Sequence, residues 1–140
     1  MIMALDVGSK RIGIAVADPS ETFALPVGTV ERSNKRNDLA RLREYFDSYG
    51  VGELVVGDPL TLSGERGVAA AAMDAFVADL RAVFTGTIHR FDERLTTAQA
   101  TKTLVAADVS RRKRRQVVDK MAAALILESF LARRRQGTVS

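Results

Sequence analysis

The chain has 140 residues, of which 46% are hydrophobic and 27% are charged, proportions that are ordinary for a globular protein. It contains no cysteine and a single histidine, which excludes disulfides and thiolate metal sites and leaves little material for a zinc site or a Ser-His-Asp triad. The formal net charge of +4 at pH 7 favours an anionic partner, of which nucleic acid is the commonest for a basic domain.

No apolar run is long enough to span a bilayer, so we expect no membrane partner. Asp6 interrupts the apolar N-terminus, which also lacks the basic region of a signal peptide. These features predict a cytoplasmic protein. The length predicts one domain over residues 1–135, with residues 136–140 as a frayed tail.

The first part of the chain predicts three consecutive strands. An apolar run over residues 2–7 contains Asp6, and a short turn separates it from a second apolar run over 11–17, which is the pattern of a hairpin. A third strand is expected over 22–30, at an edge of the sheet because Pro26 has no backbone N–H to donate. Three strands without an intervening helix predict an antiparallel meander.

The rest of the chain alternates helices and strands. This order predicts an α/β fold in which helices pack on the faces of a mixed sheet. The only histidine, His89, is expected to be a strand residue. The basic run RRKRR (111–115) is expected to interrupt the chain between the last two helices. Apolar spacing predicts helices over about 39–49, 69–83, 96–107 and 116–134, and strands over 53–59 and 87–91.

Three acidic residues stand out from their surroundings. Asp6 lies within an apolar strand, Glu93 lies at the end of the last strand, and Asp119 shares a helical stripe with Ala122 and Ala123. Ligands of open α/β sheets bind at the carboxyl ends of strands. A convergent acid cluster binds a cation, since crowded like charges otherwise raise one another's pKa, and oxygen ligands suit Mg²⁺ or Mn²⁺.

Each acid also has a simpler interpretation. Asp6 could bond the backbone of the turn that follows it. Glu93 could pair with Arg94, or it could interact with the dipole of the following helix. Asp119 could be a favourable charge near the start of the last helix. The sequence leaves these alternatives open.

Four segments, DVGSKRIGIAVAD, VVGDPLTLSGERG, DERLTT and VVDKMAAALIL, resemble in this order the YqgF family, also called RuvX, over Met1 to about Leu131. Its members are Holliday-junction-resolvase-like proteins regarded as pre-16S ribosomal RNA nucleases. The resemblance implies a ribonuclease H-like fold, with a five-stranded mixed sheet of order 3-2-1-4-5, strand 2 antiparallel, and helices on both faces. It also implies that the catalytic acids are Asp6, Glu93 and Asp119.

The segment VVGDP departs from the family, which usually has an uncharged residue where Asp58 stands. The fourth strand is expected beside the first, so Asp58 could be a fourth metal ligand. It could also be a turn residue before Pro59, and we favour the turn.

The ligand set predicts the chemistry. Two divalent ions could clamp a phosphodiester, with Asp6 bridging them and with Glu93 and Asp119 each holding one ion. Lys10 and Arg11 follow Asp6 and could contact phosphate, although Arg11 could equally be a solvated strand end.

The basic run is the second predicted nucleic-acid contact. It precedes the helix that carries Asp119, so its side chains could hold a nucleic-acid backbone over the acids. A solvated charge run is the alternative. Its members are Arg111, Arg112, Lys113, Arg114 and Arg115.

These residues predict a metal-dependent nuclease of structured nucleic acid, with 5′-end maturation of pre-16S ribosomal RNA favoured by the resemblance. A Holliday junction resolvase in DNA recombination or repair is the near alternative, and it requires a dimer; the sequence leaves monomer or homodimer open. An ATP-binding protein of the actin and sugar-kinase type would need a second domain. A non-catalytic RNA-binding ribosome-assembly factor would not need buried acids.

Overall fold

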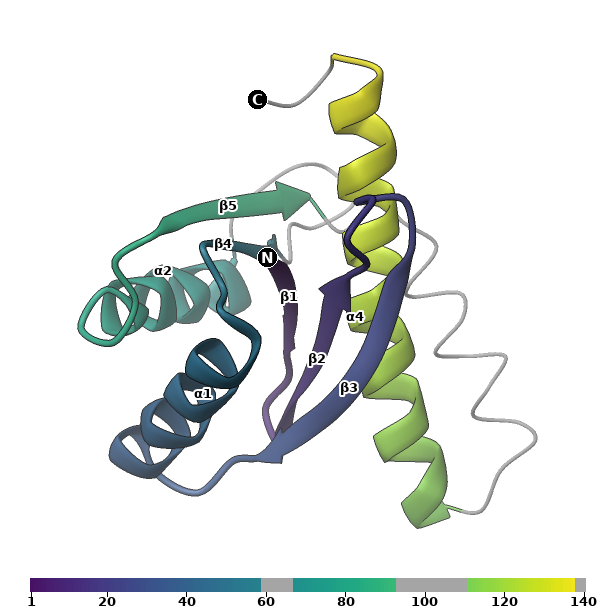
Figure 1. Ribbon diagram of the computed structural model, residues 1–140. Helices are drawn as coiled ribbons and strands as arrows, with labels where there is room; N and C mark the ends of the chain where they lie inside the picture. The colour runs from purple at the N-terminus through teal and green to yellow at the C-terminus, as the bar shows by residue number, and fades with distance from the viewer. Residues whose placement is uncertain (59–66, 93–110, 138–140) are drawn as a thin grey trace.

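The computed structural model describes residues 1–58, 67–92 and 111–137, and for residues 68, 69 and 111–120 it describes the backbone alone. The predicted helix over 96–107 therefore lies outside the described residues. The elements are β1 (Ile2–Val7), β2 (Arg11–Ala17), β3 (Ala24–Glu31), α1 (Lys35–Tyr49), β4 (Glu53–Asp58), α2 (Val68–Leu80), β5 (Thr87–Asp92) and α4 (Arg111–Arg135) (Figure 1).

The five strands form one mixed sheet in the order β3-β2-β1-β4-β5. Strand β2 is antiparallel to both of its neighbours, whereas β1, β4 and β5 run parallel. The sheet order and the antiparallel second strand are therefore confirmed. Strand β1 occupies the centre, so any side chain near its end is flanked by a strand on each side.

Strand β3 begins at Ala24, two residues later than the sequence suggests. The carboxylate of Asp18 accepts hydrogen bonds from the Ser20 hydroxyl and from the N–H groups of Phe23 (2.7 Å) and Thr22 (2.8 Å). These bonds lower the pKa of Asp18 to about 2. They hold the preceding residues in a turn, which delays the start of the strand.

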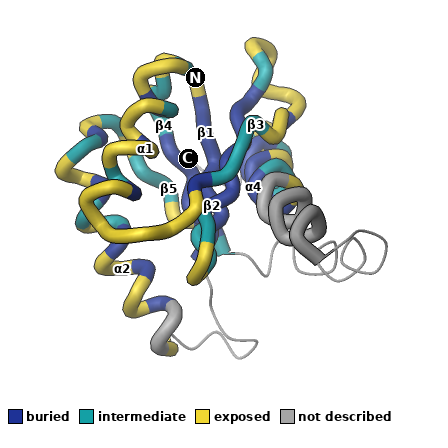
Figure 2. The backbone as a smooth tube through the Cα atoms, turned by 90° about the horizontal axis from the view of Figure 1, so that it is seen from below, coloured by how far each residue is buried: buried dark blue, intermediate teal, exposed yellow. Residues whose placement is uncertain are grey.

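Alternation along the strands separates two cores, and Figure 2 shows that the central strands of the sheet are mostly buried. In β1, Ile2 and Ala4 pack on the side of α4, whereas Met3 and Leu5 pack on the side of α1 and α2. Figure 1 shows the resulting layers, with α1 and α2 on one side of the sheet and α4 on the other. The expectation of helices on both faces is confirmed.

The face under α4 is built from small side chains. Ala4 of β1, Ala15 and Ala17 of β2, and Ala122 and Ala123 of α4 are all buried there. Small residues allow a helix to approach a sheet closely, and their tight packing excludes water. On the opposite face, β1, β2 and β4 present large residues, namely Met3, Leu5, Ile12, Ile14, Val16, Leu54 and Val56.

Helix α1 starts before its predicted first residue because Asn34 caps it. The Asn34 side chain accepts a hydrogen bond from the N–H of Asn37 (2.9 Å), which satisfies one of the unpaired donors of the first turn. Leu42 and Phe46 bury its inner face. The predicted stop at Gly50 is confirmed, since Gly50 has a left-handed φ of 60° that suits glycine.

Helix α4 begins at Arg111, so the expectation that RRKRR separates two helices is wrong. Arginine and lysine are good helix formers, and the run continues the helix that carries the buried alanines. Three further arginines end the helix, where positive charge is favourable. Within the parts of the chain that the structure describes, no helix is long and apolar enough to cross a membrane.

The C-terminal end of α4 is fixed to β4 by an ion pair. Nη2 of Arg134 lies 2.6 Å from Oε2 of Glu53, and Nε2 of His89 lies 2.8 Å from the same oxygen. The Arg134 guanidinium also lies 4.8 Å from the centre of the Phe130 ring. The hydrogen bond from Arg134, helped by that of His89, lowers the pKa of Glu53. The assignment of His89 to a strand is confirmed.

This ion pair also sets the direction of α4. Glu53 is the first residue of β4 and pairs in register with Ile2 at the start of β1. The end of α4 therefore lies at the amino ends of these parallel strands. Because α4 also packs along β1 and β2, its earlier turns extend toward the carboxyl end of β1, where Asp6 lies.

We predict that Arg134→Met lowers the stability of the protein at pH 7 by roughly 1 kcal/mol, a shift of a few degrees in Tm. The carboxylate of Glu53 has a lowered pKa when folded, so its stabilisation is present above the unfolded value, 4.5, and is lost as the pH falls below it. The Tm difference from wild type should therefore shrink below about pH 4.5. Arg135→Met, at an exposed neighbour, serves as the control. A difference that persists unchanged at pH 3 would contradict the ion-pair explanation.

Candidate active site

Asp6 is a buried carboxylate at the carboxyl end of the central strand. It is 3% exposed, and the alternation of β1 places it on the α4 face with Ile2 and Ala4. The turn between β1 and β2 is closed by a backbone hydrogen bond, in which the N–H of Gly8 donates to the carbonyl of Arg11 (3.0 Å). Asp6 thus lies at the carboxyl end of a central strand, which is where ligands of open α/β sheets bind.

Two glycines flank Asp6 on the same face. Gly13 of β2 is its direct partner in register. Gly57 of β4 is one residue beyond the pair formed by Leu5 and Val56, and it therefore lies level with Asp6. Neither glycine carries a side chain, so only the backbone of β2 and β4 lies level with the carboxylate on either side. Neither was identified from the sequence, where each is simply a glycine inside an apolar run.

Asp58 lies on the opposite face of the sheet. Strand β4 continues through Asp58, which pairs in register with Asp92, so the expectation of a turn residue is wrong. Its carboxylate lies 3.0 Å from Nη2 of Arg90, and Arg90 also bonds Asp74 of α2. Burial by itself would lower the pKa of Arg90, but the hydrogen bond with Asp74 and the charge of Asp58 outweigh it and raise that pKa. Asp58 is thus paired with Arg90 on the face of the sheet that α2 covers.

Of the two other predicted acids, the structure describes only Asp119, and only its backbone. Glu93 follows Asp92, the last residue of β5, and lies outside the described residues. The backbone of Asp119 lies in α4, one turn before Ala122, and its side chain is not described. Among the side chains that the structure describes, no group of three or more acids or histidines is arranged to hold a metal.

The predicted phosphate contacts differ in availability. Arg11 forms two hydrogen bonds with the carboxylate of Glu31, 3.0 and 3.2 Å long, so a phosphate would have to compete with that pair. Lys10 is exposed in the hairpin turn. The backbone of residues 111–115 forms the first turns of α4, and their side chains lie outside the described set.

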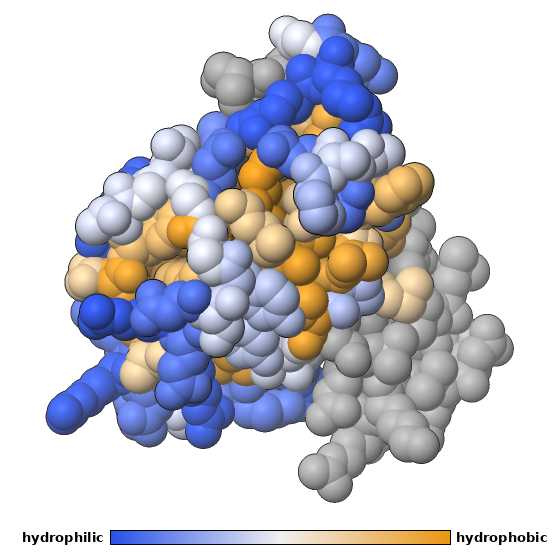
Figure 3. Space-filling model, in the orientation of Figure 1, coloured by the Kyte–Doolittle hydropathy of each residue, from blue (hydrophilic) through white to orange (hydrophobic). Residues whose placement is uncertain are grey.

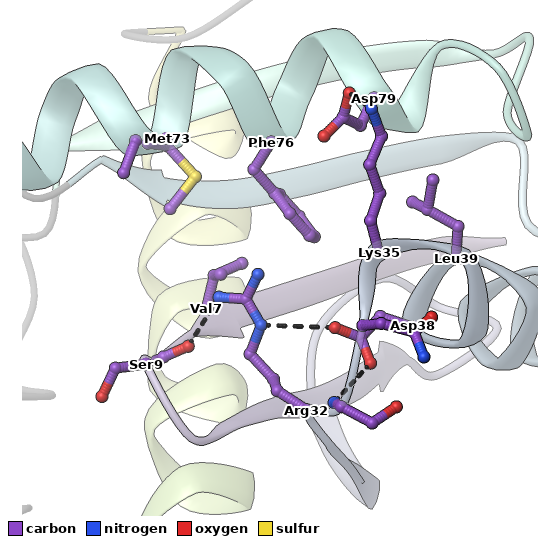
Figure 4. Close-up of a pocket in the computed structure, with 13 residues that line it drawn as sticks. Val7, Ser9, Arg32, Lys35, Asp38, Leu39, Met73, Phe76 and Asp79 are labelled. Atoms are coloured by element: carbon purple, nitrogen blue, oxygen red, sulfur yellow. Dashed lines mark hydrogen bonds and ion pairs between the residues drawn. The ribbon is translucent and has the colours of Figure 1, made fainter.

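A cavity of about 670 Å³ opens at the same end of the sheet, on the α1 and α2 side (Figure 4). It lies between the β1–β2 turn, the start of α1, and α2. The cavity could not be identified from the sequence because its walls come from three distant segments. The residues that define it include Val7, Ser9, Arg32, Lys35, Met73 and Phe76.

A family model described as "RuvX: Holliday junction resolvase" matches residues 1–133. The chain belongs to the RuvX family. A relative from Moorella thermoacetica, named "Putative pre-16S rRNA nuclease", is 48% identical over 138 residues, covering 99% of each chain. A relative of the same name from Desulforudis audaxviator is 46% identical and covers 97% of this chain and 96% of its own length.

The RuvX chain also resembles solved structures. One of these is Thermus thermophilus RuvC in complex with a Holliday junction substrate, with a TM-score of 0.58 and 16% identity over 99% of this chain and 98% of the other. A second structure of Thermus thermophilus RuvC gives a TM-score of 0.56 at 14% identity, with 98% and 96% covered. These likenesses confirm the ribonuclease H-like fold expected from the sequence.

We predict that Arg90→Met destabilises the RuvX chain by about 1–2 kcal/mol, because Asp58 and Asp74 both lose a charged hydrogen-bond donor. The measurement is denaturant unfolding at pH 7. Arg43→Met, at an exposed position of α1, should change the free energy of unfolding by less than about 0.5 kcal/mol. Equal stabilities for the two variants would show that Arg90 does not stabilise this end of the sheet.

Proposed function

We propose that this RuvX-family chain is a nuclease that hydrolyses phosphodiester bonds in structured nucleic acid, with pre-16S ribosomal RNA as its substrate. The observation that carries the proposal is the buried carboxylate of Asp6, set between two glycines at the end of the central strand. Relatives that match nearly the whole chain and bear a pre-16S rRNA nuclease name support the substrate. A nuclease for that substrate would act in the cytoplasm.

The proposed catalytic acids are Asp6, Glu93 and Asp119. The direction of α4 supports this set, since its earlier turns extend toward the end of β1 that bears Asp6. Position 119 precedes Ala122 and Ala123 by one helical turn, and both alanines are buried against the sheet. Glu93 follows the last residue of β5, whose carboxyl end lies at the same edge of the sheet as that of β1.

This donor set fits a hard divalent cation such as Mg²⁺ or Mn²⁺, because all of its ligand atoms are carboxylate oxygens. The glycines on either side of Asp6 add no side chain to this part of the proposed site. A pair of bound ions would activate water and stabilise the leaving oxygen of the phosphodiester. Asp58 is not part of the proposed set, because it faces α2 and pairs with Arg90.

The proposed contacts with the nucleic-acid backbone are Lys10 and the basic run at the start of α4. Helical geometry spaces the run so that positions 111, 114 and 115 share one side of α4, and 112 and 113 lie elsewhere around it. Arg11 would contribute less, since its guanidinium is already bound to Glu31. Such contacts orient a nucleic acid without reading its sequence.

A DNA four-way junction is the second candidate substrate. The description of the family model as a Holliday junction resolvase favours it. Symmetric cleavage of a junction needs two active sites related by two-fold symmetry, whereas trimming of an RNA precursor needs one. The oligomeric state in solution, together with cleavage of both substrates side by side, distinguishes the two proposals.

We predict that Asp6→Asn abolishes Mg²⁺- or Mn²⁺-dependent cleavage of a pre-16S RNA fragment and leaves RNA affinity within about twofold. Loss of partners outside the metal's own ligands commonly costs roughly 10–100-fold, so loss of a ligand should exceed a hundredfold. The measurement is single-turnover cleavage in metal and in EDTA.

Asp58→Asn is the matched control, since it removes an equivalent charge from the other face of the sheet. It should retain cleavage under conditions where the protein is folded. If Asp6→Asn cleaves at the wild-type rate, or if wild type cleaves equally in EDTA, the proposed metal site is wrong. If wild type binds the RNA but does not cut it in either metal, the chain is a non-catalytic RNA-binding protein.

We also predict that neutralising Arg111, Arg114 and Arg115 with glutamine flattens the salt dependence of RNA binding. Each lost phosphate contact changes the slope of log affinity against log salt by roughly 0.7–0.9, so three contacts give a change of about two to three. Neutralising Arg112 and Lys113 instead should change the slope by less. Equal slopes for wild type and the triple variant would show that the run is a solvated charge cluster that does not contact phosphates.

A further inference from the structure

We propose that the cavity between the β1–β2 turn, α1 and α2 binds one base of the nucleic-acid strand whose phosphodiester reaches Asp6. The inference rests on the proposed nuclease function and adds a positioning site for its substrate. The cavity faces away from Asp6, on the other side of the sheet. Its volume of about 670 Å³ lies within the range of roughly 300–1,000 Å³ that is usual for small-molecule sites.

The inner surface of the cavity is apolar and partly aromatic. Val7 of β1, Leu39 of α1, and Met73 and Phe76 of α2 line it. Met73 and Phe76 are only 5% and 8% exposed, so they form a firm wall. Figure 4 shows both side chains extending from α2 toward β1 and Arg32. Bases stack on such surfaces without regard to sequence, because every base has a flat π face.

Arg32 supplies a rigid polar edge. Its Nη1 donates to the carbonyl of Gly8 (2.9 Å), its Nε lies 3.6 Å from Oδ2 of Asp38, and its Cζ lies 5.6 Å from the centre of the Phe76 ring. Asp38 is itself buried and accepts a hydrogen bond from the N–H of Ser33 (2.9 Å). The guanidinium is therefore held near an aromatic ring, and both of these planar groups suit a planar ligand.

The charges that line the cavity neutralise one another. Arg32 pairs with Asp38, and Nζ of Lys35 lies 2.9 Å from Oδ1 of Asp79 across the opening between α1 and α2. The described lining residues thus supply two cations and two carboxylates, a balance that does not favour an anion. Its best occupant is thus a neutral, planar group with hydrogen-bonding edges, which describes a base. The exposed Lys10 in the adjoining turn is available to the phosphate that stays outside.

The cavity borders the hairpin turn that follows Asp6. Val7, Gly8 and Ser9, which line it, directly follow Asp6 in the chain. Because successive side chains of a strand point to opposite faces, Asp6 lies on the α4 face of the sheet and Val7 lies on the face of the cavity. A strand that lies across the end of the hairpin would place a phosphodiester at Asp6 and a neighbouring base in the cavity.

The test uses the full-length protein with [methyl-¹³C]methionine. The chain has four methionines, and Met73 alone lines the cavity, so Met1, Met3 and Met121 are internal controls. Single-stranded RNA is added in EDTA, which prevents metal-dependent cleavage. An oligonucleotide of equal length with abasic residues presents the same phosphates without bases, and free nucleoside monophosphates form a third arm.

The expected result is a shift of the Met73 methyl signal with RNA that the abasic strand does not produce. Ala72→Glu places a carboxylate at the exposed rim of the cavity and should abolish that shift and weaken RNA binding about tenfold. Ala78→Glu makes the same charge change at an exposed position of α2 outside the cavity, and it should do neither.

An unmoved Met73 signal in RNA-saturated protein overturns the proposal, as does an equal shift with the abasic strand. A shift by free nucleotides that RNA cannot reproduce also overturns it, since the occupant would then not be part of a strand. A different result would contradict the nuclease proposal alone. If the wild-type protein shows the Met73 shift but never cleaves RNA in Mg²⁺ or Mn²⁺, the base site is supported and the catalytic assignment is wrong.

Discussion

The close packing of α4 on the small side chains of β1 and β2 is the constraint on which the rest of the structure depends. Alanines at the centre of the sheet face alanines of the helix, so backbone approaches backbone and water is excluded. The Arg134–Glu53 pair then fixes the end of the helix against the start of β4. A helix held in this way has one direction and one register, and both bring its earlier turns toward Asp6.

The same packing explains why the two faces of the sheet serve different purposes. On the α4 face, Asp6 lies at the end of β1 between Gly13 and a glycine of β4. The other face carries the larger core under α1 and α2, and these two helices separate at its end to form the cavity. A single hairpin turn therefore borders a candidate catalytic carboxylate on one side and a candidate base site on the other.

The fold, more than the amino-acid composition, determines how the charged side chains are used. Several arginines of this basic chain are bound to carboxylates, including Arg11, Arg90 and Arg134, so net charge by itself does not identify a nucleic-acid surface.

Exposed apolar residues are found at one edge of the sheet. Phe23 and Leu25 are the most exposed large apolar side chains among the described residues, at the start of edge strand β3. Figure 3 shows apolar surface in the middle of the face that includes this edge.

The sequence by itself determined the local structure and the chemistry that was available. Apolar alternation predicted the strands and the exceptional place of Asp6, the stop at Gly50 ended α1, and the stripe of Ala122 and Ala123 gave α4 its buried side. The sequence pattern misjudged RRKRR, because a charge run reads as a break although its residues favour helix.

Tertiary structure decided what lies beside what. Asp58 and Asp6 are equivalent in the sequence, each an acid at the end of an apolar strand. They face opposite sides because the parallel register of β4 against β1 sets which side each residue faces. Likewise Gly13 beside Asp6, Arg134 on Glu53, and the cavity between α1 and α2 join residues that are distant in the chain. A local pattern carries the period of an element but not the register between elements, and that register depends on the packing of the whole core.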